Sequence, residues 1–329
     1  MHKLGKLTND ELDGLILSRI RHTRPEVVVR PHIGEDCAAL DLGGKLCVLS
    51  SDPITAADKG AGRIAVHVAC NDIASAGARP IGLMVTLLLP PSIEKSEILE
   101  VADDICEAAG ELGVDIIGGH TEVTDAVNWI VISTTVVGSP IGRMIPTGGA
   151  SAGDKLIITK TAGIEGTLII ARDYADRLSG ILTEKDEHTL KDMERALSVI
   201  PEGCLAASAG ASAMHDATEG GVLGAAYEMA QAAGLGVCVR LKDIPMDQLT
   251  ERICSFFDIN PYRLISSGSM LIAARDEKRI IKALAKEGIP SAVIGEFNAG
   301  GKMQAEVDGR IAELAPPDRD ELYKLKEIS

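Results

Sequence analysis

Aromatic side chains are nearly absent from this chain, whose 329 residues include one Trp, four Tyr and three Phe. The core must therefore be built from small and branched apolar side chains, which favours tightly packed alternating strands and helices. Positive charge is also scarce, because 33 Lys and Arg face 48 Asp and Glu, a formal net charge of -15. Such a surface repels nucleic acid and anionic membranes, so we expect neither as a partner, and an anionic nucleotide would need metal cations as a bridge.

Long apolar runs and paired cysteines are missing too. The longest apolar run, Ile81 to Leu89, is too short to span a membrane. The first 14 residues are too polar for a secretory signal. The seven cysteines form no CxxC pair and lie in apolar segments, a pattern typical of buried, reduced thiols. We therefore predict a cytoplasmic protein.

The stretch His67 to Pro80 has the pattern of a buried helix that carries a charge. Small and branched apolar residues surround Asn71 and Asp72 on nearly every face, and a helix that is apolar all round is normally buried. Gly77 is expected to end this helix. A buried carboxylate is costly unless a cation or a metal accompanies it. The alternative is a core helix whose Asp72 caps a neighbouring loop.

Four aspartates stand at the ends or interruptions of apolar segments: Asp36, Asp52, Asp72 and Asp216. Each alone is typical of a cap or turn residue. Together they indicate a site for a hard cation, because Mg²⁺ binds a few carboxylates together with substrate phosphates. Carboxylates that converge without a cation would raise one another's pKa, which favours metal and polyphosphate over a bare cluster of acids.

Two glycine segments could contact the phosphates. Gly118, Gly119, His120 and Thr121 follow a strand that we expect to be buried at residues 114–117. Gly220 and Gly221 precede a predicted helix, whose free N–H groups attract anions. Neither segment is a Walker P-loop, and each could be an ordinary tight turn.

His215, next to Asp216, is a candidate base or positioning group, although a structural hydrogen bond is an equally good interpretation. We expect Asp72 and His215 to take part in catalysis.

Strands and helices of similar length alternate through both halves of the chain, which predicts α/β and α+β domains. A segment rich in Gly, Pro and Ser at residues 139–154 indicates a linker, so we predict domains at 1–150 and 151–329. The predicted helices lie near residues 8–20, 63–76, 92–112, 167–178, 183–199, 204–209, 222–233, 247–257 and 277–286. The predicted strands lie near residues 45–51, 81–89, 114–117, 129–137, 155–159, 237–241, 269–274 and 292–295, followed by a polar tail.

Five motifs in this order resemble the aminoimidazole ribonucleotide (AIR) synthetase, or PurM-like, superfamily: GEDCAAL, SSDPI, HVACNDIASAGARP, GGHTEV and HDATEGGV. The resemblance implies a two-domain fold in which the N-terminal sheet pairs across a homodimer and an α+β C-terminal domain packs on it. It also implies a cleft for ATP and Mg²⁺. The implied metal ligands are Asp36, Asp52, Asp72 and Asp216, and the implied cofactor-binding residues are Gly34, Asn71, Gly118, Gly119, His120, Thr121, Gly220 and Gly221.

The chain looks most like the HypE branch, which acts in hydrogenase maturation. Members of the superfamily use ATP to phosphorylate an oxygen, often of an amide, so a small-molecule or protein-borne acceptor of that type is expected. In the HypE branch the acceptor is carried on a C-terminal Cys, whereas residues 324–329 contain none. Two alternatives remain open, a small-molecule kinase resembling thiamine monophosphate kinase and a non-catalytic ATP-binding scaffold or regulator.

Overall fold

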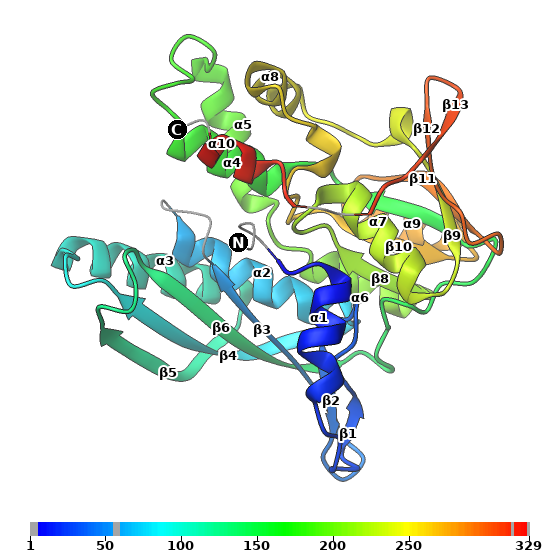
Figure 1. Ribbon diagram of the computed structural model, residues 1–329, viewed down its shortest axis with the longest axis horizontal. Coiled ribbons are helices and arrows are strands. Elements are labelled where there is room, and N and C mark those ends of the chain that lie inside the picture. The colour runs from blue at the N-terminus through cyan, green and yellow to red at the C-terminus, as the bar shows by residue number, and fades with distance from the viewer. Residues whose placement is uncertain (1–5, 55–59, 317–318, 328–329) are drawn as a thin grey trace.

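The computed structural model describes residues 6–54, 60–316 and 319–327, which form two mixed sheets with helices packed against them (Figure 1). The strands of the first sheet end at Pro140, and those of the second begin at Lys155. The predicted domain boundary at residue 150 lies between these two strands, and the bounds of the two domains stay a prediction.

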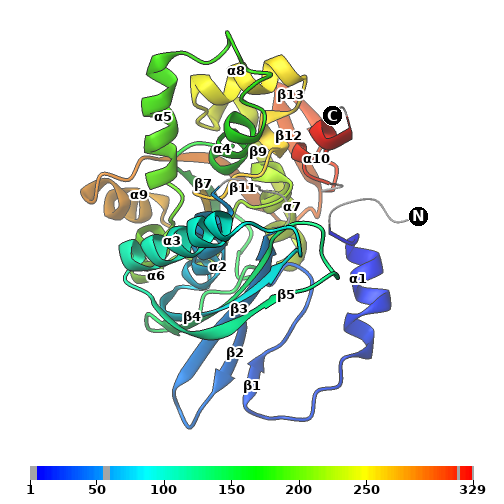
Figure 2. The same ribbon diagram turned by 90° about the vertical axis from the view of Figure 1, so that its left-hand side faces the viewer.

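The first sheet has the strand order β1-β2-β3-β6-β4-β5, and its neighbours are antiparallel except for the parallel pair β4 and β5. Its strands are β1 (Val27–Val29), β2 (Ala38–Asp41), β3 (Leu46–Ile54), β4 (Ala78–Leu89), β5 (Asp115–Val123) and β6 (Val131–Pro140). Helices α2 (Ala61–Ser75) and α3 (Lys95–Leu112) lie on one face of this sheet (Figure 2). A short helix, α1 (Asn9–Leu15), and the 3₁₀ turn Leu17–Arg19 precede it.

Helix α2 is the buried helix that the sequence predicts. All of its residues except Arg63 are buried. It begins after Gly60 and is followed by Gly77, and both glycines have a positive φ of 69°. The sheet approaches it closely, because a Cβ on Gly138 would lie 2.3 Å from the side chain of Ile73. The absence of a side chain at residue 138 therefore lets the helix lie directly on strand β6.

Strand β5 corrects the prediction for residues 114–121. We expected a buried strand that ends before the glycine pair, but the strand runs through the glycines and all nine of its residues are exposed. It forms one edge of the sheet, where Ile116, Ile117 and Val123 are 43%, 57% and 61% exposed. The apolar composition that suggested burial thus belongs to an open sheet edge, and such edges readily pair with another chain.

The second sheet has the order β13-β12-β9-β11-β7-β10-β8, with β9 and β12 as its parallel pair. Its strands are β7 (Lys155–Thr159), β8 (Ala213–Asp216), β9 (Gly236–Arg240), β10 (Met270–Ala274), β11 (Ser291–Asn298), β12 (Met303–Val307) and β13 (Arg310–Glu313). The helices of this half are α4 (Ile164–Asp173), α5 (Glu184–Arg195), α6 (Ile200–Ala209), α7 (Gly221–Ala232), α8 (Gln248–Phe257), α9 (Glu277–Lys286) and α10 (Leu322–Glu327). Two 3₁₀ turns, Leu241–Asp243 and Pro261–Arg263, flank α8.

The predicted bounds of helices and strands agree well with the structure where the apolar pattern is long. They agree poorly where the pairing of strands decides which residues form an element. Helix α9 has the predicted bounds, whereas α4 begins and ends earlier than expected because Gly163, with a φ of 74°, precedes its first turn. The predicted polar tail is wrong, since residues 303–313 form two strands and residues 322–327 a helix.

Polar side chains of α2 connect it to the second half of the chain. The Asn71 amide donates to the Leu197 carbonyl at 2.8 Å and accepts from the Val199 N–H at 2.9 Å. One turn further on, the Ser75 hydroxyl donates to Asp216 at 3.0 Å. These contacts fix the end of β8 against α2 and so place Asp216 beside Asp72.

All seven cysteines are free thiols, and Cys37, Cys70 and Cys254 are buried as expected. Cys106 is exposed, contrary to the prediction of buried thiols. None of the helices in the described ranges is both long and apolar enough to cross a bilayer.

Candidate functional site

Four carboxylates from four elements meet between the two halves of the chain. Asp36 lies in the loop before β2, Asp52 near the end of β3, Asp72 in α2 and Asp216 at the end of β8. The electrostatic influence of the other three reaches Asp72. Ligand atoms of Asp36, Asp216 and His215 all lie within 4.8 Å of one another. The sequence therefore predicted the convergence of these acids, and their roles as metal ligands stay predictions.

Asp72 is buried at the centre of this cluster. The Ser50 hydroxyl on β3 donates a 2.6 Å hydrogen bond to Oδ2 of Asp72 and orients the carboxyl group. Burial raises the pKa of Asp72 well above its usual value, and the carboxylates of Asp52 and Asp216 raise it further. A cation beside these carboxylates would have the opposite effect on the pKa, because it favours the charged form.

Asp216 is fully buried, and only one of its two carboxylate oxygens has a hydrogen bond within the described residues. Ser75 donates to its Oδ1, but Oδ2 has no hydrogen-bond partner among the residues that the structure describes. Burial raises the pKa of Asp216 to about 6, although the positive charge of His215 opposes this shift. An unpaired buried acceptor costs about 1–3 kcal/mol, and a bound cation would remove that cost by coordinating the free oxygen.

His215 lies between two carboxylates. Its Nε2 forms a 3.1 Å hydrogen bond with Glu228 Oε2. Its Nδ1 lies 3.2 Å from Asp36 Oδ2, and this second contact is an ion pair that is not aligned as a hydrogen bond. Burial alone would lower the pKa of His215, but the charge of Asp36 and the contacts with Glu228 raise it well above its usual value. Burial alone would raise the pKa of Asp36. The positive charge of His215 outweighs this effect and lowers the pKa of Asp36 to about 2.

Both ring nitrogens of His215 thus face carboxylates, and its raised pKa favours the imidazolium form, which has no lone pair to accept a further proton. Of the two roles considered for His215, the arrangement favours positioning of Asp36 over action as a base. Lys6 adds a further positive charge at the rim. Burial opposes that charge, but Asp36, Glu228 and Glu219 raise the pKa of Lys6.

The donor set fits Mg²⁺, the metal that the sequence predicts. Several carboxylate oxygens converge, and hard oxygen ligands are what Mg²⁺ prefers. The free Oδ2 of Asp216 and the mutual repulsion around Asp72 are features that a bound cation would resolve. This fit rests on the chemistry of the side chains.

The glycine segment on β5 does not join this cluster within one chain. Asp52 is opposite Thr134, and Thr134 is opposite Val85. Val85 is in turn opposite Gly119. Three strand spacings of about 4.8 Å, or roughly 14 Å, therefore separate Asp52 from Gly119. Within one chain residues 118–121 therefore lie apart from the acids, and their contact with a phosphate stays a prediction.

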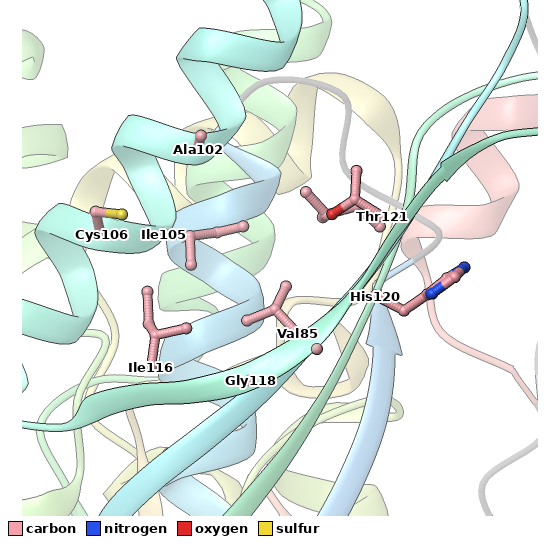
Figure 3. Close-up of a pocket in the computed structure, with 10 residues that line it drawn as sticks. Val85, Ala102, Ile105, Cys106, Ile116, Gly118, His120 and Thr121 are labelled. Carbon is pink, nitrogen blue, oxygen red and sulfur yellow. The ribbon is translucent and has the colours of Figure 1, made fainter.

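Residues 118–121 instead line a separate hollow of about 310 Å³ between α3 and β5 (Figure 3). Ile105 and Cys106 of α3 face it, and Thr121 points toward it, whereas His120 points away from α3. The His120 side chain is 62% exposed and its Nε2 lies 3.0 Å from Glu122. The need for glycine at residue 119 is steric, because a Cβ there would lie 1.8 Å from the Val85 carbonyl oxygen.

The N-terminus of α7 does hold an anion, but one that the chain itself supplies. The Gly220 N–H donates to Asp320 Oδ2 at 2.8 Å, and the Gly221 N–H donates to the Thr218 carbonyl. Both N–H groups are therefore already paired within the chain, and their contact with a phosphate stays a prediction. Burial raises the pKa of Asp320 to about 7, although hydrogen bonds from the Leu322 and Gly220 N–H groups oppose the shift.

Two other predicted cofactor-binding residues have structural contacts. Both polar atoms of the Asn71 amide bond the backbone of residues 197–199. Gly34 has a φ of 80°, and a Cβ there would lie 3.3 Å from the Cβ of Ala232 on α7, so this glycine lets the loop that carries Asp36 pack against α7. Contact of either residue with a nucleotide stays a prediction.

Sequence reasoning missed several residues at this site. Ser50 and Ser75 stand two and three positions from predicted aspartates, and small polar residues inside apolar segments were a usable signal. Glu165 is buried near Asp216 and was assigned to a loop. Asp320 gave no signal, because its partner Gly220 is 100 residues away.

Comparison with known proteins identifies both halves. Residues 34–139 match the N-terminal domain of AIR synthase related protein, and residues 151–308 match its C-terminal domain. Carbamoyl dehydratase HypE of Escherichia coli is 28% identical over 280 residues, 80% of each chain. The hydrogenase expression/formation protein HupE of Azotobacter chroococcum is 25% identical over 287 residues, 84% of this chain and 82% of HupE.

Solved structures show the same fold. Hydrogenase maturation protein HypE in complex with ATP covers 97% of both chains, with a TM-score of 0.72 and 22% identity. AaThiL complexed with AMPPCP and TMP covers 87% of this chain and 91% of its own, with a TM-score of 0.71 and 21% identity. The predicted two-domain PurM-like fold, with two mixed sheets and helices, is confirmed at this level.

Proposed function

The chain belongs to the AIR synthase related family, and from this premise we propose that it is an ATP- and Mg²⁺-dependent enzyme. In this proposal it phosphorylates, and so activates, an amide- or carbonyl-type oxygen. A relative named hydrogenase expression/formation protein is 25% identical and a carbamoyl dehydratase HypE is 28% identical. A hydrogenase maturation protein HypE of the same fold was solved in complex with ATP. We infer an acceptor of that chemical type, in the maturation of hydrogenase or of another metallocentre.

The observation that carries this proposal is the cluster of carboxylates with the unpaired Oδ2 of Asp216 at its buried end. In a chain with a net charge of -15, a triphosphate would be repelled unless cations bridged it to the acids. Mg²⁺ held by Asp36, Asp52, Asp72 and Asp216 would bridge the phosphates and neutralise the charge that develops on them.

The side chains around the acids hold them in place for this task. Ser50 orients the carboxyl group of Asp72, and Ser75 orients that of Asp216. His215 holds Asp36 and offsets part of the negative charge. Because these partners are themselves buried, the ligand atoms are fixed before the nucleotide binds, which lowers the entropic cost of binding.

The proposal is tested by measuring how Mg²⁺ and AMPPCP bind to the wild type and to Asp216→Asn by calorimetry. The wild type is expected to bind AMPPCP only with Mg²⁺, and the variant to lose at least tenfold in affinity, because a neutral amide is a much poorer ligand for Mg²⁺. Asp192→Asn is the matched control, since the Asp192 side chain is 75% exposed on α5. Equal, metal-independent binding by all three proteins would contradict the proposal.

A second measurement separates an enzyme from a non-catalytic nucleotide binder. ADP release from Mg²⁺-ATP is followed with and without small amides. Tight ATP binding without turnover under any of these conditions would favour a scaffold or regulator over the proposed enzyme.

We also propose that the chain forms a homodimer along strand β5. All nine residues of this strand are exposed, and Ile117 and Val123 are more than half exposed on an unpaired edge. Long apolar edges of this kind are normally covered. A partner copy on β5 would also cover residues 118–121, which a single chain leaves far from its own acids.

A further inference from the structure

A short segment between α5 and α6 contacts the helix that carries Asp72. The Asn71 amide of α2 bonds the backbone of residues 196–199, which we call the α5–α6 segment. This segment belongs to neither sheet. The contact with Asn71 can therefore fix Asp72 relative to Asp216 only if the segment is itself anchored to the half of the chain that carries Asp216.

The side chain of Lys160 supplies this anchor. Its Nζ donates to the carbonyl oxygen of Ala196 at 2.8 Å and to that of Ser198 at 2.7 Å. It also lies 2.7 Å from Oε1 of Glu202 in α6, and the two charged side chains are only 15% and 2% exposed. Each of the three N–H groups of the ammonium thus has an acceptor. Together, Lys160 and Asn71 hold three successive carbonyl groups of the α5–α6 segment.

The backbone of Lys160 has a conformation that suits glycine better than lysine. Its φ is 56°, and the other non-glycine residues with a positive φ in the described ranges are two aspartates, Asp258 and Asp308. Asp tolerates this left-handed region, whereas a long side chain rarely adopts it. Strain of this kind persists only where the surrounding contacts fix it. The contacts of the buried ammonium therefore hold the backbone in this conformation.

Lys160 lies at the same edge of the second sheet as Asp216. Strand β7 ends at Thr159, directly before Lys160. The Thr159 hydroxyl accepts from the Met270 N–H at 3.0 Å, and Met270 on β10 is opposite Asp216 on β8. Two strand spacings of about 4.8 Å, or roughly 10 Å, therefore separate this end of β7 from Asp216.

Helix α2 is thus attached to one sheet edge at two points that are one helical turn apart. Ser75 donates to Asp216 directly, and Asn71 is connected to Lys160 through the α5–α6 segment. A helix held at one point could rotate about that contact. Attachment at two points also fixes the direction in which Asp72 faces Asp216.

We propose that Lys160 is a positioning residue of the metal site, which fixes Asp72 relative to Asp216 through the α5–α6 segment and Asn71. This inference rests on the proposed function and adds to it a residue that acts from outside the set of ligands. Mg²⁺ requires near-ideal octahedral geometry, so a small displacement of one carboxylate weakens binding. Residues that orient metal ligands commonly change metal affinity by 10- to 100-fold when they are replaced.

The test measures binding of Mn²⁺-AMPPCP by electron paramagnetic resonance, with Mn²⁺ as the probe in place of Mg²⁺. The test variant combines Lys160→Gly with Glu202→Gln, because glycine adopts the positive φ without strain and no buried carboxylate then loses its partner. We expect it to lose at least tenfold in affinity and to change the spectrum of the bound ion. Glu202→Gln alone is the matched control and should bind like the wild type, since Lys160 keeps its two carbonyl acceptors.

Two further variants separate positioning from a general loss of stability. Val237→Ala truncates a buried side chain on β9, two strands away from β7, and is expected to lower the melting temperature without weakening the binding of Mn²⁺-AMPPCP. Asn71→Ala is expected to weaken binding about as much as the test variant. Adding Asn71→Ala to the test variant should cause little further loss, because both changes act through the same segment.

The outcomes distinguish this inference from the proposed function. A wild-type protein that does not bind Mn²⁺-AMPPCP would contradict the proposed function, and the inference with it. If the wild type binds, an unchanged affinity and spectrum in the test variant would overturn the role of Lys160 alone. An equal loss of affinity in Val237→Ala, or fully additive losses from the Lys160 and Asn71 changes, would overturn it as well.

Discussion

The buried carboxyl group of Glu165 makes the stability of this protein depend on pH in a predictable direction. Its ordinary pKa is 4.5, and burial raises the folded-state pKa to about 7. Between these values the folded state holds a proton that the unfolded state has lost. Stability therefore falls as the pH rises through this window, and the loss is complete above pH 7.

A difference of about 2.5 pH units corresponds to about 3 kcal/mol at 1.36 kcal/mol per unit. Since the unfolded carboxyl group is already partly ionised at pH 5, the part that falls between pH 5 and pH 8 is roughly 2–3 kcal/mol. Glu165→Gln has no ionisable group at this position. The variant is therefore expected to lose roughly 2–3 kcal/mol less than the wild type over this interval.

The assay is urea unfolding of the wild type and Glu165→Gln at pH 5 and at pH 8, compared as a difference of differences. Asp320, whose pKa is also raised to about 7, is present in both proteins, so the part of its titration that is independent of Glu165 cancels. Glu287→Gln, at an exposed position after α9, is the matched control and should follow the wild type. If Glu165→Gln loses as much stability as the wild type, the reasoning about the buried carboxyl group is refuted.

Two further predictions concern the first sheet. Gly119→Ala is expected to lower the free energy of unfolding by at least about 3 kcal/mol, because its Cβ would lie 1.8 Å from the Val85 carbonyl oxygen. The control is Gly110→Ala, where a Cβ on α3 has open space, and this variant should raise the free energy of unfolding by about 0.5–1 kcal/mol. Equal melting temperatures for the two variants would contradict the steric argument. Ile117→Lys is expected to halve the molar mass measured by light scattering, while Ile311→Lys on the edge strand β13 leaves it unchanged. A wild-type protein that is already monomeric would rule out pairing along β5.

Features of the fold that depend on residues close together in the chain could be predicted from the sequence. Helix α2 was predictable because its apolar residues occupy every face and Gly77 ends it. The convergence of the aspartates was predictable because a carboxylate next to apolar residues is tolerated only with a partner. Both inferences use properties of residues that are close together in the chain.

The exposure of β5 could not be predicted in the same way. An apolar run describes an open edge as well as a buried strand, and only the order of the strands in the sheet decides between them. The same order separates Gly119 from Asp52, although the sequence suggested one phosphate site.

The sequence by itself determined the acids, the helix that buries one of them and the small side chains that pack around it. Only the tertiary structure decided that Asp320 occupies the N-terminus of α7 and that Ser267 lies beside Glu165. Both contacts join residues about 100 positions apart, where no local periodicity operates and where chain crossings and strand pairing alone set which groups meet.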